Sequence, residues 1–327
     1  VDTIEAACRR DGERRVNPRC LGMSVAAGRP AHRHAGAMQI DTVEAGAPSR
    51  WRRMVALGDS LTEGLSDSSR QAEGEYRGWA DRLAAAIATA PGRVEALAYA
   101  NLAVRSRRTD QVVAEQIPRA IELGGDLVTV LVGANDLVRF DTRLGPIADR
   151  LGEGIATLRS SGAAVLLVTP FAPDRRHLRR LNERFDRFGA AVRSIAHETG
   201  SILLDVGADP FRADPRSWAE DRVHLSSHGH RVLSYRAAER IGLPGAAVIG
   251  ALDIAMHDEP GRFDAPTDDV SWLARHVLPW AVRRMRGRTA GDGRQAKHSA
   301  LVQVAGQVVR PVEPSRESAP RVDAAQT

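Results

Sequence analysis

The feature that most constrains the fold is a series of five short apolar runs separated by helical patterns. The runs of strand length are 54–57, 94–99, 127–132, 164–168 and 202–206. The helical patterns are 78–90, 110–123, 146–161 and 178–197, with a closing helix at 227–241. Because the runs are continuous rather than alternating, they indicate strands buried on both faces of a parallel sheet. Alternation of such strands with helices predicts a doubly wound α/β fold, whose sites lie at the carboxyl ends of the strands.

The segments on either side of this alternation differ in composition. The N-terminal stretch is rich in Arg, Ala, Gly and His and lacks periodicity, so we predict that it is disordered. Because the chain opens on Val1 while Met23 and Met38 lie inside this stretch, we interpret part of it as a leader from an upstream start. The predicted division is a disordered segment 1–50, a folded domain 51–243, an extension 244–288 with a basic amphipathic helix, and a disordered tail 289–327.

The composition favours one sizeable domain and argues against several kinds of partner. The chain has 327 residues, of which 43% are hydrophobic, and a formal net charge of +5. Lys297 is the single lysine among 46 basic residues, and the arginines are scattered, so we predict no nucleic-acid partner. No apolar stretch approaches the ~20 residues of a membrane span, and the start lacks a signal-peptide pattern. A cytoplasmic monomer is therefore the expectation.

Three of the predicted strands end in residues that belong together chemically. The first strand is followed by Ser60, the second by Ser106 and the third by Asn135. In a parallel sheet these three ends lie on one rim. A serine there becomes a nucleophile only with a base and an orienting carboxylate, and Asp221 and His224 follow the fifth strand at a spacing that supplies both. Backbone N–H groups and the Asn135 amide would stabilise an oxyanion. Together these groups predict acyl transfer.

The segments that carry these residues also resemble a known family. They read GDSLTEG at 58–64, NLAVRSR at 101–107, GAND at 133–136 and DRVH at 221–224. In this order and spacing they resemble the four signature blocks of the SGNH hydrolases, also called the GDSL esterase/lipase family, over residues 52–243. The resemblance implies a flavodoxin-like three-layer α/β/α sandwich with a five-stranded parallel sheet. It also implies an esterase that needs no cofactor and cleaves small-molecule esters through an acyl-enzyme.

By the same resemblance each block contributes a defined role. Ser60 is the nucleophile, His224 the base and Asp221 its orienter. The oxyanion hole combines the Ser60 backbone N–H, the Asn135 side chain and the backbone N–H of Ser106. The family typically has glycine at the position of Ser106. If the backbone there requires a positive φ, serine adds strain of ~1–2 kcal/mol and low activity is an alternative outcome.

Several of these residues also fit structural roles. Ser60 could cap the following helix, with Glu63 closing a capping box. Asn135 suits a turn, and we expect the neighbouring Asp136 to be structural. We expect Asp59 to cap the helix or bond within the turn, and it is left outside the triad.

Metal binding and membrane contact are the weaker readings of two other patterns. The histidines at 224, 228 and 230 are closely spaced, but no matching set of carboxylates or cysteines accompanies them, so no metal is predicted. The two cysteines, Cys8 and Cys20, form neither a disulfide framework nor a zinc pattern. The basic amphipathic stretch 270–288 is interpreted as a helix packed on the domain, with a membrane-surface anchor as the alternative.

Ester hydrolysis is thus weighed against three alternatives. An acyltransferase or a carbohydrate deacetylase would use the same residues. A nucleotide- or flavin-binding module is disfavoured, because Asp59 and Glu63 stand where phosphate would lie and no G-x-G-x-x-G follows the first strand. A catalytically weakened binding protein remains the reading that Ser106 favours.

Overall fold

The computed structural model describes residues 50–67, 76–175, 178–257, 289–305 and 308–311. Its described strands are β1 (Arg53–Gly58), β2 (Leu97–Asn101), β3 (Leu127–Leu131), β4 (Ala164–Val168), β5 (Ile202–Leu204), β6 (His298–Ala305) and β7 (Val308–Pro311). Its described helices are α1 (Ser60–Glu63), α2 (Trp79–Ala88), α3 (Thr109–Gln111), α4 (Ile117–Glu122), α5 (Ala134–Leu137), α6 (Leu144–Ser160), α7 (Arg179–Thr199), α8 (Ser227–Arg240) and α9 (Ala246–Met256). A π-helical turn, Val112–Gln116, joins α3 to α4, and short 3₁₀ turns occupy Pro210–Arg212 and Pro215–Ser217.

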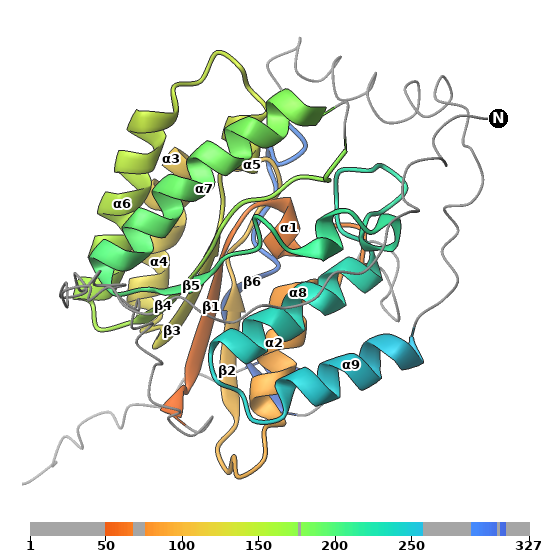
Figure 1. Cartoon of the computed structure of the whole chain (residues 1–327). Coiled ribbons are helices and arrows are strands. Elements are labelled where there is room, and N and C mark those ends of the chain that lie inside the picture. The colour runs from red at the N-terminus through yellow and green to blue at the C-terminus, as the bar shows by residue number, and fades with distance from the viewer. Residues whose placement is uncertain (1–49, 68–75, 176–177, 258–288, 306–307, 312–327) are drawn as a thin grey trace, which may run out of the picture. The chain divides into compact units, whose positions relative to one another are not determined.

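The strands form one sheet in the order β5-β4-β3-β1-β2-β6-β7 (Figure 1). The first five strands of the chain pair in parallel throughout. Their order, 2-1-3-4-5, is that of the flavodoxin-like folds. The predicted fold class is therefore confirmed, whereas the predicted sheet of five parallel strands is too small, because β6 and β7 extend the described sheet with antiparallel pairs.

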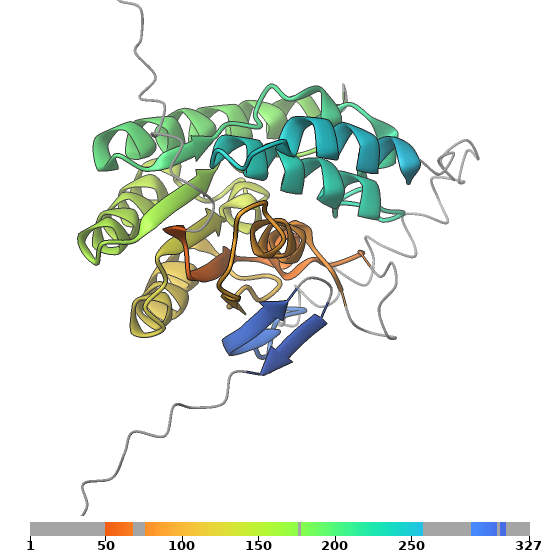
Figure 2. The ribbon, with the colours of Figure 1, turned by 90° about the horizontal axis from the view of Figure 1, so that it is seen from below.

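The C-terminal hairpin corrects the predicted disordered tail. β6 pairs antiparallel with β2, and β7 pairs antiparallel with β6, at the edge of the sheet that Figure 2 shows in blue. The prediction is wrong for 298–305 and 308–311, because it weighed the polar composition of the segment instead of its strand period. β6 lies between β2 and β7 and pairs with both, and its Val304 is 4% exposed opposite Leu97. Residues 312–327 lie outside the described part.

Helices cover both faces of the sheet, which explains the continuous apolar runs. In β1, Met54 and Ala56 belong to a buried cluster with α2, α8 and α9. Val55 and Leu57 belong to a second cluster with α4, α6 and α7. Because the central strands are buried on both sides, polar residues such as Thr129 are rare within the runs, and most of them lie where the strands end.

The predicted helices agree with the structure to within a few residues at their ends, whereas the second strand begins later than predicted. Val94 is exposed in the turn before β2, so the strand starts at Leu97. The region after Gly242, where the sequence pattern is ambiguous, forms α9. The amphipathic stretch 270–288 and residues 1–49 lie outside the described residues.

Candidate active site

The end of β1 is shaped so that α1 can begin at once. Gly58 has φ +151°, and a Cβ there would lie 2.3 Å from the carbonyl oxygen of Leu131, so only glycine fits. The side chain of Gln116, in the π-helical turn, accepts the Gly58 N–H at 2.8 Å and donates to the Gly58 carbonyl at 2.9 Å. This clamp fixes the strand end two residues before Ser60.

The cap of α1 is supplied by Asp59, which contradicts the capping role considered for Ser60. The Asp59 carboxylate accepts the backbone N–H of Leu61 at 3.1 Å. Glu63 does not close a capping box, because its carboxylate accepts the backbone N–H of Arg105 at 2.7 Å and pairs with that guanidinium. The Ser60 hydroxyl is therefore left to face a side chain from another part of the chain.

That side chain is His224. Its Nε2 lies 3.0 Å from Ser60 Oγ, and its Nδ1 lies 2.5 Å from Asp221 Oδ2. The other oxygen of Asp221 accepts the backbone N–H groups of Val223 and His224 at 3.0 and 2.9 Å. Arg222, directly after Asp221, has φ +57°. The structure thus joins Ser60, His224 and Asp221 in one chain of contacts.

The electrostatics of this turn set the tautomer of His224. Burial raises the pKa of Asp221, but the hydrogen bonds and charge of His224 outweigh it and lower the pKa to about 2. The carboxylate is therefore ionised at neutral pH and accepts the proton on His224 Nδ1. The lone pair on Nε2 is then directed at the Ser60 hydroxyl.

The other two predicted site residues lie on neighbouring loops. Ser106 has φ +66°, the backbone conformation in which a residue other than glycine is strained. Within the described residues, neither the Ser60 nor the Ser106 N–H donates a hydrogen bond. The Asn135 amide nitrogen donates to Asp59 Oδ2 at 3.1 Å and to the Arg107 carbonyl at 3.0 Å. An oxyanion near Asn135 would therefore compete with two existing acceptors.

Asp59 should give protein stability an unusual pH dependence. Its side chain is buried, and burial raises its pKa from 3.8 to about 7 against the opposing hydrogen bond from Leu61. Between these two values the unfolded chain ionises and the folded protein does not. The contribution of Asp59 to the free energy of unfolding should therefore fall by about 1.4 kcal/mol per pH unit as the pH rises from about 4 to 7, and the difference between wild type and Asp59→Asn isolates it from the opposite contribution of buried His230.

Urea unfolding at several pH values tests this against two variants. Asp59→Asn should lack this contribution, whereas Asp149→Asn, at an exposed site on α6, should retain it. A wild-type pH slope unchanged in Asp59→Asn would contradict the raised pKa.

The remaining histidines of the cluster are structural. His230 is fully buried, and its Nδ1 accepts the Trp79 N–H at 3.2 Å while its Nε2 lies 3.3 Å from the Leu65 carbonyl. Burial lowers the pKa of His230 to about 4. His228 lies 3.8 Å from Asp214. No group of three His, Cys, Asp or Glu side chains suited to a metal occurs in the described part of the chain.

Sequence reasoning missed the charged groups that hold the loops around Ser60. Arg82 binds Asp67 in a buried ion pair at 2.6 Å, and Glu63 pairs with Arg105. Lys297, from the end of the chain, donates to the Glu63 carbonyl at 2.8 Å. Only Lys297 carried a usable signal, because it is the single lysine of the sequence.

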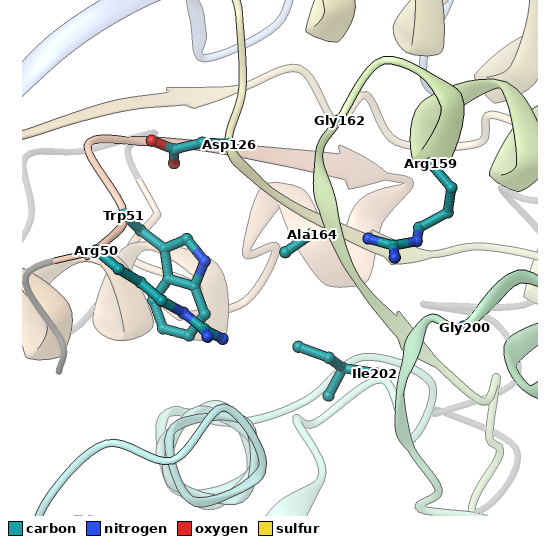
Figure 3. Close-up of a pocket in the computed structure, with 8 residues that line it drawn as sticks. All are labelled: Arg50, Trp51, Asp126, Arg159, Gly162, Ala164, Gly200 and Ile202. Carbon is teal, nitrogen blue, oxygen red and sulfur yellow. The ribbon is translucent and has the colours of Figure 1, made fainter. Parts of the chain in front are cut away.

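A separate pocket lies at the opposite end of the sheet, and its polar side chains hold the ends of strands and helices. Its lining comprises Arg50, Trp51, Asp126, Arg159, Gly162, Ala164, Gly200 and Ile202 (Figure 3). Asp126 accepts two backbone N–H groups at the start of β1. Arg159 donates to two backbone carbonyls, and Arg50 stacks on Trp51 at 4.2 Å. These polar groups are occupied in holding strand and helix ends, and Ser60 lies at the other end of β1.

Comparison with known proteins agrees with this geometry. The family model of the GDSL-like lipase/acylhydrolases matches residues 56–232, which is more than half of the chain. The chain belongs to this family. Among curated GDSL-type relatives, a GDSL-like esterase of Mycobacterium tuberculosis is 29% identical over 174 residues, covering 49% of this chain and 53% of the relative. An acetylxylan esterase of Geobacillus stearothermophilus is 32% identical over 133 residues, covering 36% and 59%. The chain thus spans little more than half the length of these relatives.

Solved structures share the fold. The acetylxylan esterase Axe2 of Geobacillus stearothermophilus matches with a TM-score of 0.51 and 21% identity, over 58% of this chain and 94% of Axe2. The enzyme LAE5 from the Lake Arreo metagenome, described as an α/β hydrolase, matches with a TM-score of 0.50 and 24% identity, over 59% and 95%. At these identities the likeness establishes the fold alone.

None of the described helices has the length and apolar character needed to span a bilayer.

Proposed function

We propose that the protein is a serine hydrolase that cleaves carboxylic esters through an acyl-enzyme on Ser60. The observation that carries the proposal is the chain of contacts from Ser60 Oγ through His224 to Asp221, at 3.0 and 2.5 Å. Membership of the GDSL-like lipase/acylhydrolase family supports the same reaction class.

The chemistry follows from this arrangement. Ser60 Oγ attacks the ester carbonyl carbon while its proton passes to His224 Nε2. His224 then returns the proton to the leaving oxygen, which departs as the alcohol and leaves the acyl group on Ser60. Water attacks this acyl carbon as His224 accepts its proton, and His224 gives that proton back to Ser60 as the acid leaves. Asp221 holds the ring in the reactive tautomer and stabilises its charged form.

The negative charge that develops on the carbonyl oxygen of the substrate is stabilised by hydrogen-bond donors. We assign this role to the N–H groups of Ser60 and Ser106, which donate to no other group among the described residues, and to the Asn135 amide. Each well-aimed donor contributes roughly 100- to 1,000-fold in kcat. The positive φ of Ser106 suits an N–H turned toward a substrate, at the cost of backbone strain.

A carbohydrate acetyl ester is the substrate that the relatives favour. An acetylxylan esterase of Geobacillus stearothermophilus is found both among the curated relatives and among the similar solved structures. Transfer of the acyl group to an alcohol instead of water is the second candidate, since it would use the same intermediate.

Burst kinetics test the proposal. With a nitrophenyl acetate, wild type should release about one nitrophenol per protein rapidly before the steady state. Ser60→Ala should show neither burst nor turnover. The control Ser160→Ala, on the exposed face of α6, should behave as wild type. A burst that persists in Ser60→Ala would overturn the assignment of the nucleophile.

Two further measurements identify the substrate and the group that accepts the acyl chain. Release of acetate from acetylated xylo-oligosaccharides should exceed release of longer acids from matched esters. Formation of a new ester with an added alcohol would indicate the acyltransferase. A wild type with neither burst nor turnover on any ester would indicate a binding protein.

A further inference from the structure

The C-terminal segment 289–297 contacts the proposed active site from outside the family match. It ends at Lys297, immediately before β6, and it approaches both α1 and the turn that holds Ser106. Resting on the proposed function, we propose that this segment is a positioning strap, in which Lys297 and Gly291 hold the nucleophile and the oxyanion-hole turn in place.

The first anchor of the strap is the ammonium group of Lys297. It donates to the carbonyls of Glu63 and Tyr76 at 2.8 and 3.0 Å and to Asp81 Oδ2 at 2.6 Å. An ammonium has three donors, so these three oxygens use all of them. The side chain of Lys297 is 20% exposed, which limits competition from water.

These three acceptors belong to elements that surround Ser60. Glu63 is the last residue of α1, the helix that Ser60 begins. Asp81 lies in the first turn of α2, where it also accepts the Gly78 N–H at 2.7 Å. Gly78 in turn packs against the residue after α1, because a Cβ on Gly78 would lie 2.4 Å from the Cα of Gly64. Lys297 therefore joins the end of α1 to the start of α2.

The second anchor is Gly291, which lies against the turn of Ser106. A Cβ at Gly291 would be 2.0 Å from the carbonyl oxygen of Arg105 and 3.6 Å from the Cβ of Ser106. Arg105 is also bound from the other side, where Glu63 accepts its backbone N–H at 2.7 Å. The turn with the strained Ser106 is thus held between α1 and the strap.

The chemistry of Lys297 suits this place better than arginine does. Of the 46 basic residues Lys297 is the single lysine. Three oxygens that converge on one point match a compact ammonium, whereas the planar guanidinium fork presents its donors in one plane. All the remaining Lys and Arg positions are arginine, and the one lysine lies where two carbonyl oxygens and a carboxylate oxygen meet.

A purely structural role for the strap makes a different prediction. If the strap only stabilises the pairing of β6 with β2, the loss of its contacts lowers the stability of the protein and leaves kcat unchanged below the unfolding temperature. If it positions the reacting groups, kcat falls while KM stays nearly constant, because substrate binding does not involve Lys297.

The test compares Lys297→Met with Arg294→Met. The second variant removes one positive charge from the same segment, where the side chain of Arg294 donates to the nearby Ala290 carbonyl at 3.2 Å and the backbone N–H, which the substitution leaves in place, donates to the Gly291 carbonyl. For a nitrophenyl acetate, Lys297→Met should lower kcat by about tenfold to 100-fold, with KM within about twofold. Arg294→Met should match wild type in both. A Lys297→Met variant with wild-type kcat and a lowered melting temperature would overturn the proposal.

Restoring the amine separates positioning from a general loss of folding. Lys297→Cys, in a background with Cys8→Ser and Cys20→Ser, offers one thiol for alkylation with bromoethylamine, which rebuilds a lysine-like side chain. Alkylation should return most of the lost kcat, and alkylation with iodoacetamide should not. Equal recovery with both reagents would argue against a role for the charge.

Hydrogen exchange tests the strap without relying on enzymatic activity, so the outcome for the strap can be separated from the outcome for the proposed function. The N–H groups of Gly64 and Leu65 both donate to the Ser60 carbonyl, at 3.1 and 3.0 Å, so their hydrogen exchange reports on α1. Exchange should be about tenfold faster in Lys297→Met than in Arg294→Met. Unchanged exchange would refute the strap even if Ser60→Ala abolishes hydrolysis. Faster exchange without any esterase activity would refute the proposed function alone.

Discussion

His224→Ala should lower kcat/KM for a nitrophenyl ester by about 10⁵-fold, because the Ser60 hydroxyl then loses the base that takes its proton. Asp221→Asn should cost about tenfold to 100-fold less, since it leaves the base in place but weakens the preference for the reactive tautomer. The control is His197→Ala, an exposed histidine near the end of α7, which should retain wild-type kinetics.

Steady-state rates of the two variants at neutral pH give the comparison. Asp221→Asn should retain more activity than His224→Ala, because the imidazole that takes the Ser60 proton is still present. A His224→Ala variant with more activity than Asp221→Asn would reverse the proposed roles of base and orienter.

Asp67→Ala should lower the free energy of unfolding by about 3–5 kcal/mol, because it leaves the buried guanidinium of Arg82 without its carboxylate. The side chain of Asp67 is fully buried and that of Arg82 is 9% exposed. One oxygen of Asp67 accepts hydrogen bonds from both Nε and Nη2 of Arg82, at 3.0 and 2.6 Å. The other oxygen accepts a hydrogen bond from the Ser227 hydroxyl. Because Ser227 begins α8 directly after the loop of His224, activity should fall as well.

Urea unfolding with a fitted slope gives the measurement. The matched control is Glu122→Ala, which breaks the exposed pair with Arg119 at 2.9 Å and should cost less than about 1 kcal/mol. A loss below about 1 kcal/mol in Asp67→Ala, similar to the control, would show that the ion pair contributes no more than a surface contact.

The sequence predicts the parallel sheet well because burial on both faces leaves a strong local pattern. Strand runs such as 164–168 contain no polar residue, and helices cover both sides of the sheet. The contact between Ser60 and His224 spans 164 positions, yet it could be anticipated from chemistry, because a nucleophile needs a base and strand ends share one rim.

What the sequence did not predict depends on contacts without a local pattern. β6 pairs with β2, but it lies in a C-terminal tail that is polar overall, so the composition of the tail was misleading. Glu63 fits a capping box by spacing, but its carboxylate binds Arg105, 42 positions away. The three acceptors of Lys297 come from segments more than 200 positions earlier, and no period in the sequence links them.

Labelling with a fluorophosphonate probe, followed by mass mapping of the modified peptide, shows which residue is the nucleophile. We expect one adduct, on Ser60, whose formation is lost in His224→Ala and retained in His197→Ala. An adduct on another residue, or esterase activity that survives with Ser60 unmodified, would contradict it.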